Sequence, residues 1–397
     1  MKYVVIVPDG ASDYPIEMLD SRTPLEVANK PYMNELAKNG ILGRVNTVPS
    51  GFTPSSDVAN LSLFGYEPEK YYCGRGPLEA ANLGIDFSEN DIVFRCNLIT
   101  ETDGILVDYS AGHITDKEAK VLIEDLNKKL GKEDIIFYAG KSYRHILLYK
   151  NGSIYDFDKL TYFPPHDIMG KRIKEHLPKG KNSKILTDMI LKSKEVLEEH
   201  PINKVRIDLK ENPANMIWLW SAGRKINIPS FKERFGLTGA VISAVDLING
   251  IGKLIGFEVV RVKGATGYYD TNYKGKAEEA LKALNRVDFV FVHIEATDEA
   301  GHNQDLRAKI NCIEKIDELV VGTIINGLKG EEYRILITPD HPTPIKLRTH
   351  TNDPVPFLMA GYGIKKGNFS IYSEKEALNS NLYFKTGKDL IEYFLKV

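Results

Sequence analysis

Three apolar runs, each followed closely by an acidic residue, constrain the fold of this chain most. They are residues 2–7 (KYVVIV), 288–295 (DFVFVHIE) and 334–338 (RILIT). Uninterrupted runs of β-branched and other apolar residues are typical of strands that are buried on both faces, as in a parallel sheet. A fourth run, residues 254–262 (LIGFEVVRV), is expected to add another strand.

Helical patterns lie between these runs. Residues 277–285 form one such pattern, and residues 306–328 form a longer one in which apolar residues recur at helical spacing. Strands that alternate with helices imply right-handed crossovers between parallel strands. We therefore predict an α/β fold with a doubly wound, mostly parallel sheet.

The middle of the chain has a different pattern. Between about residues 90 and 205, short apolar runs lie close together among charged helical stretches, which predicts an α+β module with hairpins. The runs are residues 91–100, 104–110, 134–140 and 144–149. We expect residues 1–89 and 206–397 to form a discontinuous core, and residues 90–205 to form a domain inserted into it.

Composition limits the class of protein. The net charge of −2 gives no overall basic field, so we expect neither nucleic acid nor an anionic membrane as a partner. The cysteines Cys73, Cys96 and Cys312 form no CxxC pair and are interpreted as small buried hydrophobes in a reducing compartment. No signal sequence and no apolar stretch near the ~18 residues of a membrane span is found, so a cytoplasmic location is expected.

Acidic residues and a histidine follow three of the predicted strands. Asp9, Asp298 and the pair Asp340–His341 each lie just past a strand end. Because ligands bind beyond the carboxyl ends of parallel strands, these side chains are expected to converge at one edge of the sheet. Any one of them alone is equally consistent with a helix cap or a hydrogen-bonded structural group.

Two further histidines extend this pattern. His302 lies four residues after Asp298, close enough on one helical turn for both to bind one ion, and His350 follows nine residues after His341. Carboxylate and imidazole donors together suit Mn²⁺, Zn²⁺, Fe²⁺ or Mg²⁺ rather than a soft thiolate site. The combined pattern predicts a metal centre.

Two serines precede an apolar helical pattern in the segment TPSSDVAN, residues 53–60. A serine at a helix N-terminus lies beside free backbone N–H groups, and a metal-bound serine oxygen is a nucleophile that can attack phosphorus. The alternative is that Ser55 or Ser56 is simply the helix cap.

Several motifs resemble the alkaline-phosphatase superfamily and, within it, the archaeal-type cofactor-independent (2,3-bisphosphoglycerate-independent) phosphoglycerate mutases. The resemblance runs the length of the chain. The motifs are VPDGASD (7–13), TPLEVANKP (23–31), GFTPSSDVANLSLFGY (51–66), GRGPLEAA (74–81), GLTGAVISAVDLINGIGK (236–253), GATGYYDTNYKGKA (264–277), EATDEAGH (295–302), TPDHPTP (338–344) and THTNDPVPF (349–357).

The resemblance implies an alkaline-phosphatase-like core and an isomerase of glycolysis and gluconeogenesis that interconverts 3-phosphoglycerate and 2-phosphoglycerate. Ser56 matches the serine that is phosphorylated in the family. The resemblance implies two divalent metal ions (Mn, Mg, Zn or Co) and no 2,3-bisphosphoglycerate. The matching ligands are Asp9, Ser56, Asp340 and His341 for one ion, and Asp298, His302 and His350 for the other. The inserted domain is expected to be the lid that covers the substrate.

Cationic side chains are expected to hold the carboxylate and phosphate of this small-molecule substrate. The candidates are Arg95, His113, Arg144, Arg224 and Lys276. Each could instead form a surface ion pair. Two other functions stay open: a phosphohydrolase or homoserine-kinase-like phosphotransferase of the same superfamily, and a non-catalytic metal-dependent binding protein. An oligomer is possible.

Overall fold

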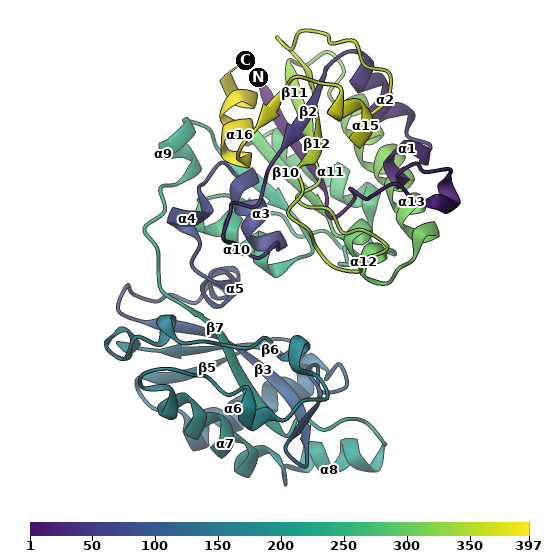
Figure 1. Ribbon diagram of the computed structural model, residues 1–397. Coiled ribbons are helices and arrows are strands. Elements are labelled where there is room, and N and C mark those ends of the chain that lie inside the picture. The colour runs from purple at the N-terminus through teal and green to yellow at the C-terminus, as the bar shows by residue number, and fades with distance from the viewer. Residues whose placement is uncertain (397) are drawn as a thin grey trace. The chain divides into compact units, whose positions relative to one another are not determined.

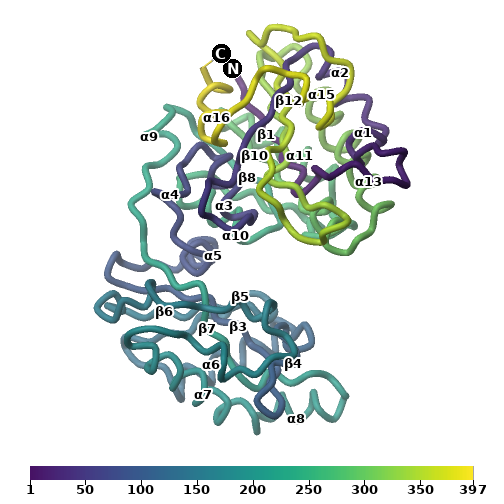
Figure 2. Tube along the Cα trace, in the orientation of Figure 1, coloured from purple at the N-terminus to yellow at the C-terminus, as the bar shows by residue number. Residues whose placement is uncertain are grey.

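The computed structural model describes residues 1–396, and the chain divides into two compact units. The first unit combines residues 1–72 with residues 228–396, and the second unit comprises Cys73–Asn227. The second unit is therefore inserted into the first and extends beyond residues 90–205 at both ends (Figures 1 and 2). Within residues 1–396, none of the helices combines the length and apolar character that crossing a bilayer requires.

An eight-stranded sheet forms the centre of the first unit, in the order β13-β2-β12-β11-β1-β10-β8-β9. Strand β1 (Lys2–Pro8) lies between β11 (Tyr333–Ile337) and β10 (Phe289–Ile294), and it is parallel to both. Strand β8 (Gly239–Ile242) continues the parallel order beside β10. The three apolar runs thus form neighbouring central strands, and the predicted α/β class is confirmed.

The two edges of this sheet differ from the prediction. Strand β12 (Val355–Gly361) is antiparallel to both β11 and β2 (Ile41–Val45), and β13 (Tyr383–Phe384) completes that edge. The strand predicted at residues 254–262 is wrong over most of its length. Leu254 ends helix α10 (Asp246–Leu254), and only β9 (Glu258–Val259) pairs, at the outer edge of β8.

Helices cover both faces of the sheet, as a doubly wound fold requires (Figure 1). Along β1, Val4 and Ile6 pack into the core cluster that contains α2, α11 and the helical segment around residue 320. On the opposite face, Phe291 of β10 stacks on Phe64, next to helices α3 and α10. The helices of this unit are α1 (Pro24–Val27), α2 (Pro31–Lys38), α3 (Ser56–Leu63), α4 (Pro68–Tyr71), α9 (Phe231–Phe235), α10 (Asp246–Leu254), α11 (Tyr273–Leu284), α12 (Ala296–His302), α13 (Leu306–Lys315), the π-helix Ile316–Val321, α14 (Gly322–Gly327), α15 (Glu374–Leu378) and α16 (Gly387–Lys396).

The second unit is an antiparallel sheet covered by helices. Its long central strand β3 (Ile92–Thr102) pairs with β4, β6 and β7, and β5 lies outside β6. Strand β7 was not predicted; because it pairs with β3, it draws the residues up to Asn227 into this unit. The other elements are β4 (Ile105–Asp108), β5 (Ile135–Lys141), β6 (Arg144–Tyr149), β7 (Met216–Gly223), α5 (Arg75–Leu83), α6 (Asp116–Leu130), α7 (Ser183–Leu197) and α8 (Pro201–Asp208).

Candidate metal centre

The carboxyl ends of three central strands bring the predicted ligands together. Asp9 directly follows β1, and Asp340–His341 lie in the loop that follows β11. Helix α12 begins just after β10 and presents Asp298 and His302 from one helical turn. These positions follow from the parallel order, because it gathers the carboxyl ends of β1, β10 and β11 at one sheet edge.

One group of donors surrounds His341, whose side chain is fully buried. Its Nε2 lies 3.5 Å from Asp9 Oδ1 and 3.4 Å from Asp340 Oδ2. The hydroxyl of Ser56 lies 3.1 Å from the same nitrogen. These are four of the predicted ligands, and three of them, Asp9, Asp340 and His341, offer donor atoms within 4.8 Å of one another.

A second group of donors surrounds Asp298. Its Oδ2 lies 3.2 Å from His302 Nε2, and its Oδ1 lies 3.2 Å from His350 Nε2. The two imidazoles are themselves 2.8 Å apart between their Nε2 atoms. The ring of His350 also stacks on that of His341, with centroids 3.9 Å apart, so the two groups adjoin. The structure therefore brings all seven predicted ligands into one cluster.

The buried carboxylates of this cluster repel one another, so the cluster is suited to bind a cation. Burial, together with the carboxylates of Asp340, Asp298 and Glu295, raises the pKa of Asp9 well above its usual range. Among the described residues, neither carboxylate oxygen of Asp9 receives a well-aligned hydrogen bond. A divalent cation bound here would remove this repulsion and use the free oxygens. The donor set of carboxylates and imidazoles thus fits the predicted ions.

His302 and Asp298 shift each other's pKa. Burial alone would lower the pKa of His302, but its hydrogen bond to Asp298 and the charge of that carboxylate raise it to about 9. Burial likewise opposes ionisation of Asp298, yet the hydrogen bonds from His302 and His350 hold its pKa well below the usual range.

Neighbouring polar groups fix the orientation of the carboxylates. Asn60 Nδ2 donates to Asp340 Oδ2 over 2.7 Å, and the amide of Gly10 donates to Oδ1 over 3.1 Å. The hydroxyl of Thr343 donates to Asp298. Gly10 has φ of 63°, and a Cβ atom there would lie 2.5 Å from Thr343 Oγ1, so only glycine allows this close approach.

Ser56 is the first residue of α3, and Ser55 occupies the N-cap position. No side-chain hydrogen bond caps this helix, so neither serine acts as the cap that the alternative interpretation requires. Ser56 is half-buried, with its hydroxyl turned toward His341. The positive end of the α3 dipole and its free N–H groups lie beside it, which favours an anionic oxygen or a bound phosphate.

Sequence reasoning missed several residues that support the cluster. His293 Nε2 lies 3.0 Å from Asp9 Oδ2, and Glu295 joins Asp9 and Asp298 in a third group of possible ligands. Fully buried Lys309 donates to Asp13 over 2.8 Å and to the carbonyls of Ser12 and Thr343. The signal for His293 was a polar residue inside an apolar strand; nothing in the sequence marked Lys309.

The predicted substrate-binding residues lie in different places. Lys276 is fully buried in the first unit, and its ammonium group donates to the carbonyl of His293 over 3.0 Å. Burial lowers the pKa of Lys276 to about 8, although the negative charges of Glu295 and Asp9 act in the opposite direction. Lys276 therefore contacts the backbone of β10 beside the candidate ligands, and its role in binding a substrate stays a prediction.

The other four candidates belong to the second unit. Arg95 is buried against Glu79 (3.1 Å) and lies over the ring of Trp220, which Arg75 also faces. Arg144 lies over the ring of Tyr143, and exposed His113 packs against the same ring. Arg224 is engaged elsewhere, since it forms a pair with Asp158 over 2.7 Å. Three arginines and one histidine thus gather around Trp220 and Tyr143, namely Arg75, Arg95, Arg144 and His113.

A comparison with known proteins gives the following matches. A family model described as 2,3-bisphosphoglycerate-independent phosphoglycerate mutase matches residues 37–203. A protein of that name from Methanothrix thermoacetophila is 49% identical over 397 residues, covering 100% of both chains. A probable one from Geobacter sulfurreducens is 47% identical, again over 100% of both.

Two solved structures agree with these matches. A protein from Pyrococcus horikoshii has a TM-score of 0.85 at 33% identity and covers 99% of this chain and 96% of its own. A cofactor-independent phosphoglycerate mutase from Thermoplasma acidophilum has a TM-score of 0.67 at 26% identity, covering 100% of this chain and 99% of its own.

Proposed function

The chain belongs to the family of 2,3-bisphosphoglycerate-independent phosphoglycerate mutases, which are isomerases, and from this premise we propose that it interconverts 3-phosphoglycerate and 2-phosphoglycerate in glycolysis and gluconeogenesis through a phosphorylated Ser56. One observation carries the proposal. The Ser56 hydroxyl lies 3.1 Å from His341 Nε2, at the margin of a cluster that supplies carboxylates and imidazoles for cations.

Two divalent ions fit this cluster. Asp9, Ser56, Asp340 and His341 would hold one, and Asp298, His302 and His350 would hold the other. When bound, such ions lower the pKa of a coordinated hydroxyl and stabilise charge on a phosphoryl group. The requirement for 2,3-bisphosphoglycerate is absent because the serine itself stores the phosphoryl group between the two half-reactions.

The two half-reactions mirror each other. In the first, the Ser56 oxygen forms a bond to phosphorus while the bond between phosphorus and the 3-oxygen of the substrate breaks, which leaves glycerate. Glycerate then turns within the site, and its 2-oxygen takes the phosphoryl group back from Ser56. The Asn60 and Gly10 contacts that orient Asp340 keep this site in one geometry throughout both transfers.

The inserted unit is proposed to act as the lid. Hydrolysis of the phosphorylated serine would turn a mutase into a phosphatase, so water must be excluded while glycerate turns. The cationic groups around Trp220 and Tyr143 suit the carboxylate of glycerate, because arginine binds carboxylates through two parallel hydrogen bonds. Of the predicted substrate residues, Arg144 and His113 support this role better than the others, because Arg95 and Arg224 already form ion pairs and Lys276 donates to a backbone carbonyl.

A coupled assay tests the proposal. The purified protein is given 3-phosphoglycerate without 2,3-bisphosphoglycerate, and formation of 2-phosphoglycerate is followed before and after EDTA. Activity that the chelator abolishes and that Mn²⁺ restores supports the proposal. Ser56→Ala should remove activity, and the matched control Ser55→Ala should keep most of it. Release of free phosphate at a rate that rivals isomerisation would instead identify a phosphohydrolase.

A further inference from the structure

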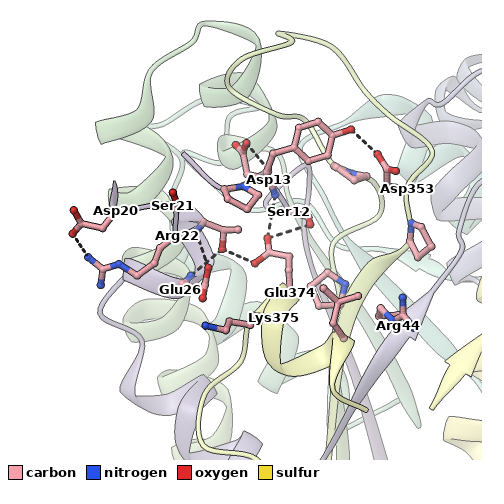
Figure 3. Close-up of a pocket in the computed structure, with 17 residues that line it drawn as sticks. Ser12, Asp13, Asp20, Ser21, Arg22, Glu26, Arg44, Asp353, Glu374 and Lys375 are labelled. Carbon is pink, nitrogen blue, oxygen red and sulfur yellow. Dashed lines mark hydrogen bonds and ion pairs between the residues drawn. The ribbon is translucent and has the colours of Figure 1, made fainter. Parts of the chain in front are cut away.

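A cavity of about 680 Å³ lies in the first unit (Figure 3). None of the seven predicted metal ligands lines it. Its wall includes Ser12 and Asp13, which follow Asp9 along the chain, and Pro342, which follows His341. A ligand in this cavity would therefore contact the loops that carry the predicted ligands without occupying the centre. Its volume falls within the range typical of small-molecule sites.

The carboxylates of this cavity already have partners within the protein. Glu374 accepts hydrogen bonds from the hydroxyls of Ser12 and Thr23 and from the amide of Asp13 (Figure 3). Asp353 accepts from the hydroxyl of Tyr14 over 2.7 Å. The remaining pairs are Asp13 with Lys309, Asp20 with Arg22, and Glu26 with the amide of Thr23. The acidic groups are thus committed to holding the walls together.

Two cations of the cavity have no such partner. Within residues 1–396, the side chains of Arg44 on β2 and Lys375 on α15 form no hydrogen bond and no ion pair, and Arg44 has only a ring contact with Tyr383 at 5.6 Å. The Nε atom of Arg44 is buried without an acceptor. A buried donor without an acceptor is costly, so an anion that reaches Arg44 would relieve this cost. Both cations line the cavity, one on helix α15 and one on strand β2, and these two elements pack against each other.

Several rings also line the cavity. The rings of Tyr14, Pro15, Pro342, Pro354 and Pro356 line the cavity. Rings of this kind offer apolar contact surfaces to a ring of the ligand. The occupant that suits both features has an anionic head for the two cations and a ring for these walls.

We propose that this cavity binds a small molecule in which a phosphate monoester is joined to an apolar ring, such as a nucleoside monophosphate. A phosphate monoester carries about −1.5 to −2 charges near neutral pH, which matches the charge of Arg44 and Lys375 together. A carboxylate would neutralise one of them only. This site is independent of the proposed mutase reaction, because it uses none of the residues assigned to that reaction.

Calorimetric titration tests this proposal with adenosine monophosphate, adenosine and inorganic phosphate as probes. The full chain is used with Mn²⁺ bound. Adenosine monophosphate should bind saturably, and adenosine and phosphate should each bind at least about tenfold more weakly, since each lacks one half of the recognised chemistry. Equal affinity for phosphate and the nucleotide, or for adenosine and the nucleotide, would overturn the proposal.

Variants locate the bound molecule. Arg44→Gln and Lys375→Gln should each lower the affinity for adenosine monophosphate by about tenfold, the loss expected for one charge-assisted hydrogen bond. Arg22→Gln lines the same cavity but removes a group already paired with Asp20, so its effect should be smaller. Lys375 is exposed, so its variant should fold normally even if Arg44→Gln does not. Unchanged affinity in Lys375→Gln would refute this site.

Discussion

The buried Lys309 ammonium group is predicted to hold in place the loops that carry the candidate metal ligands, and Lys309→Met tests this. The group is fully buried and donates over 2.8 Å to both Asp13 Oδ2 and the Thr343 carbonyl, and over 3.3 Å to the Ser12 carbonyl. Removing one partner of a buried ion pair costs about 3–5 kcal/mol, because the other charge stays buried without compensation. Asp13 retains the amides of Tyr14 and Ile345, so we expect a loss near 3 kcal/mol in the free energy of unfolding.

The double variant Lys309→Met/Asp13→Asn isolates the cause. It removes both charges while asparagine can still accept from Ile345, so it should be more stable than Lys309→Met alone. Urea unfolding followed by circular dichroism is the appropriate assay, because Trp218 and Trp220 both lie in the second unit and report on that unit. As a control, Lys128→Met breaks an exposed pair with Asp125 and should leave stability nearly unchanged.

The same variant should affect the metal centre. Because Lys309 joins residues 12–13 to residue 343, its loss should loosen the loops next to Asp9 and His341. We expect faster amide exchange in both loops and weaker Mn²⁺ binding, with partial recovery in the double variant. Stability and exchange equal to those of the unmodified protein, or a double variant less stable than Lys309→Met, would refute this reasoning.

Three other side chains give further predictions. His302→Ala should reduce the number of bound Mn²⁺ ions by one, while the site around His341 keeps its ion. Elemental analysis of the purified variant measures this number. Loss of both ions would contradict the division into two ligand groups. Arg95→Gln should lower the free energy of unfolding by about 3 kcal/mol or more, because it removes the ion-pair partner of buried Glu79. Arg224→Gln, which breaks a more exposed pair, should lower it by about 1 kcal/mol or less. Equal losses in denaturant titrations would contradict this prediction. Burial lowers the pKa of Lys30 to about 8, so between about pH 8 and 10 the unfolded chain binds more protons than the folded chain, and the free energy of unfolding should rise with pH. In urea titrations at stepped pH, Lys30→Met should reduce that rise by on the order of 2 kcal/mol. A rise that the variant does not reduce would contradict this prediction.

The central strands could be predicted because their burial leaves a strong sequence signal. Residues 2–7, 288–295 and 334–338 are rich in β-branched and other apolar residues, and each forms a strand with neighbours on both sides. The run at 254–262 misled because apolar residues at the end of helix α10 adjoin those of a two-residue edge strand. Length and apolar character do not distinguish these two cases.

The candidate site was predictable where the sheet itself positions residues. Parallel strands require Asp9 and Asp340 to meet, and helical spacing requires Asp298 and His302 to share a turn. The burial of Lys276 beside the His293 carbonyl could not be predicted, because its motif shows a cation but not its surroundings. Lys309 could not be found, since its partners are distant in sequence and only the packing of helix α13 against both loops brings them together.

Phosphorylation of Ser56 is the central claim, and rapid quenching tests it directly. The protein is mixed with 3-phosphoglycerate and Mn²⁺, quenched in acid within the first turnovers and digested, and the peptide containing residues 53–60 is analysed by mass spectrometry. The account predicts a phosphoryl group on Ser56 that is absent in Ser56→Ala and present in Ser55→Ala. Isomerisation at full rate without phosphate on this peptide, or with phosphate on Ser55 instead, would contradict it.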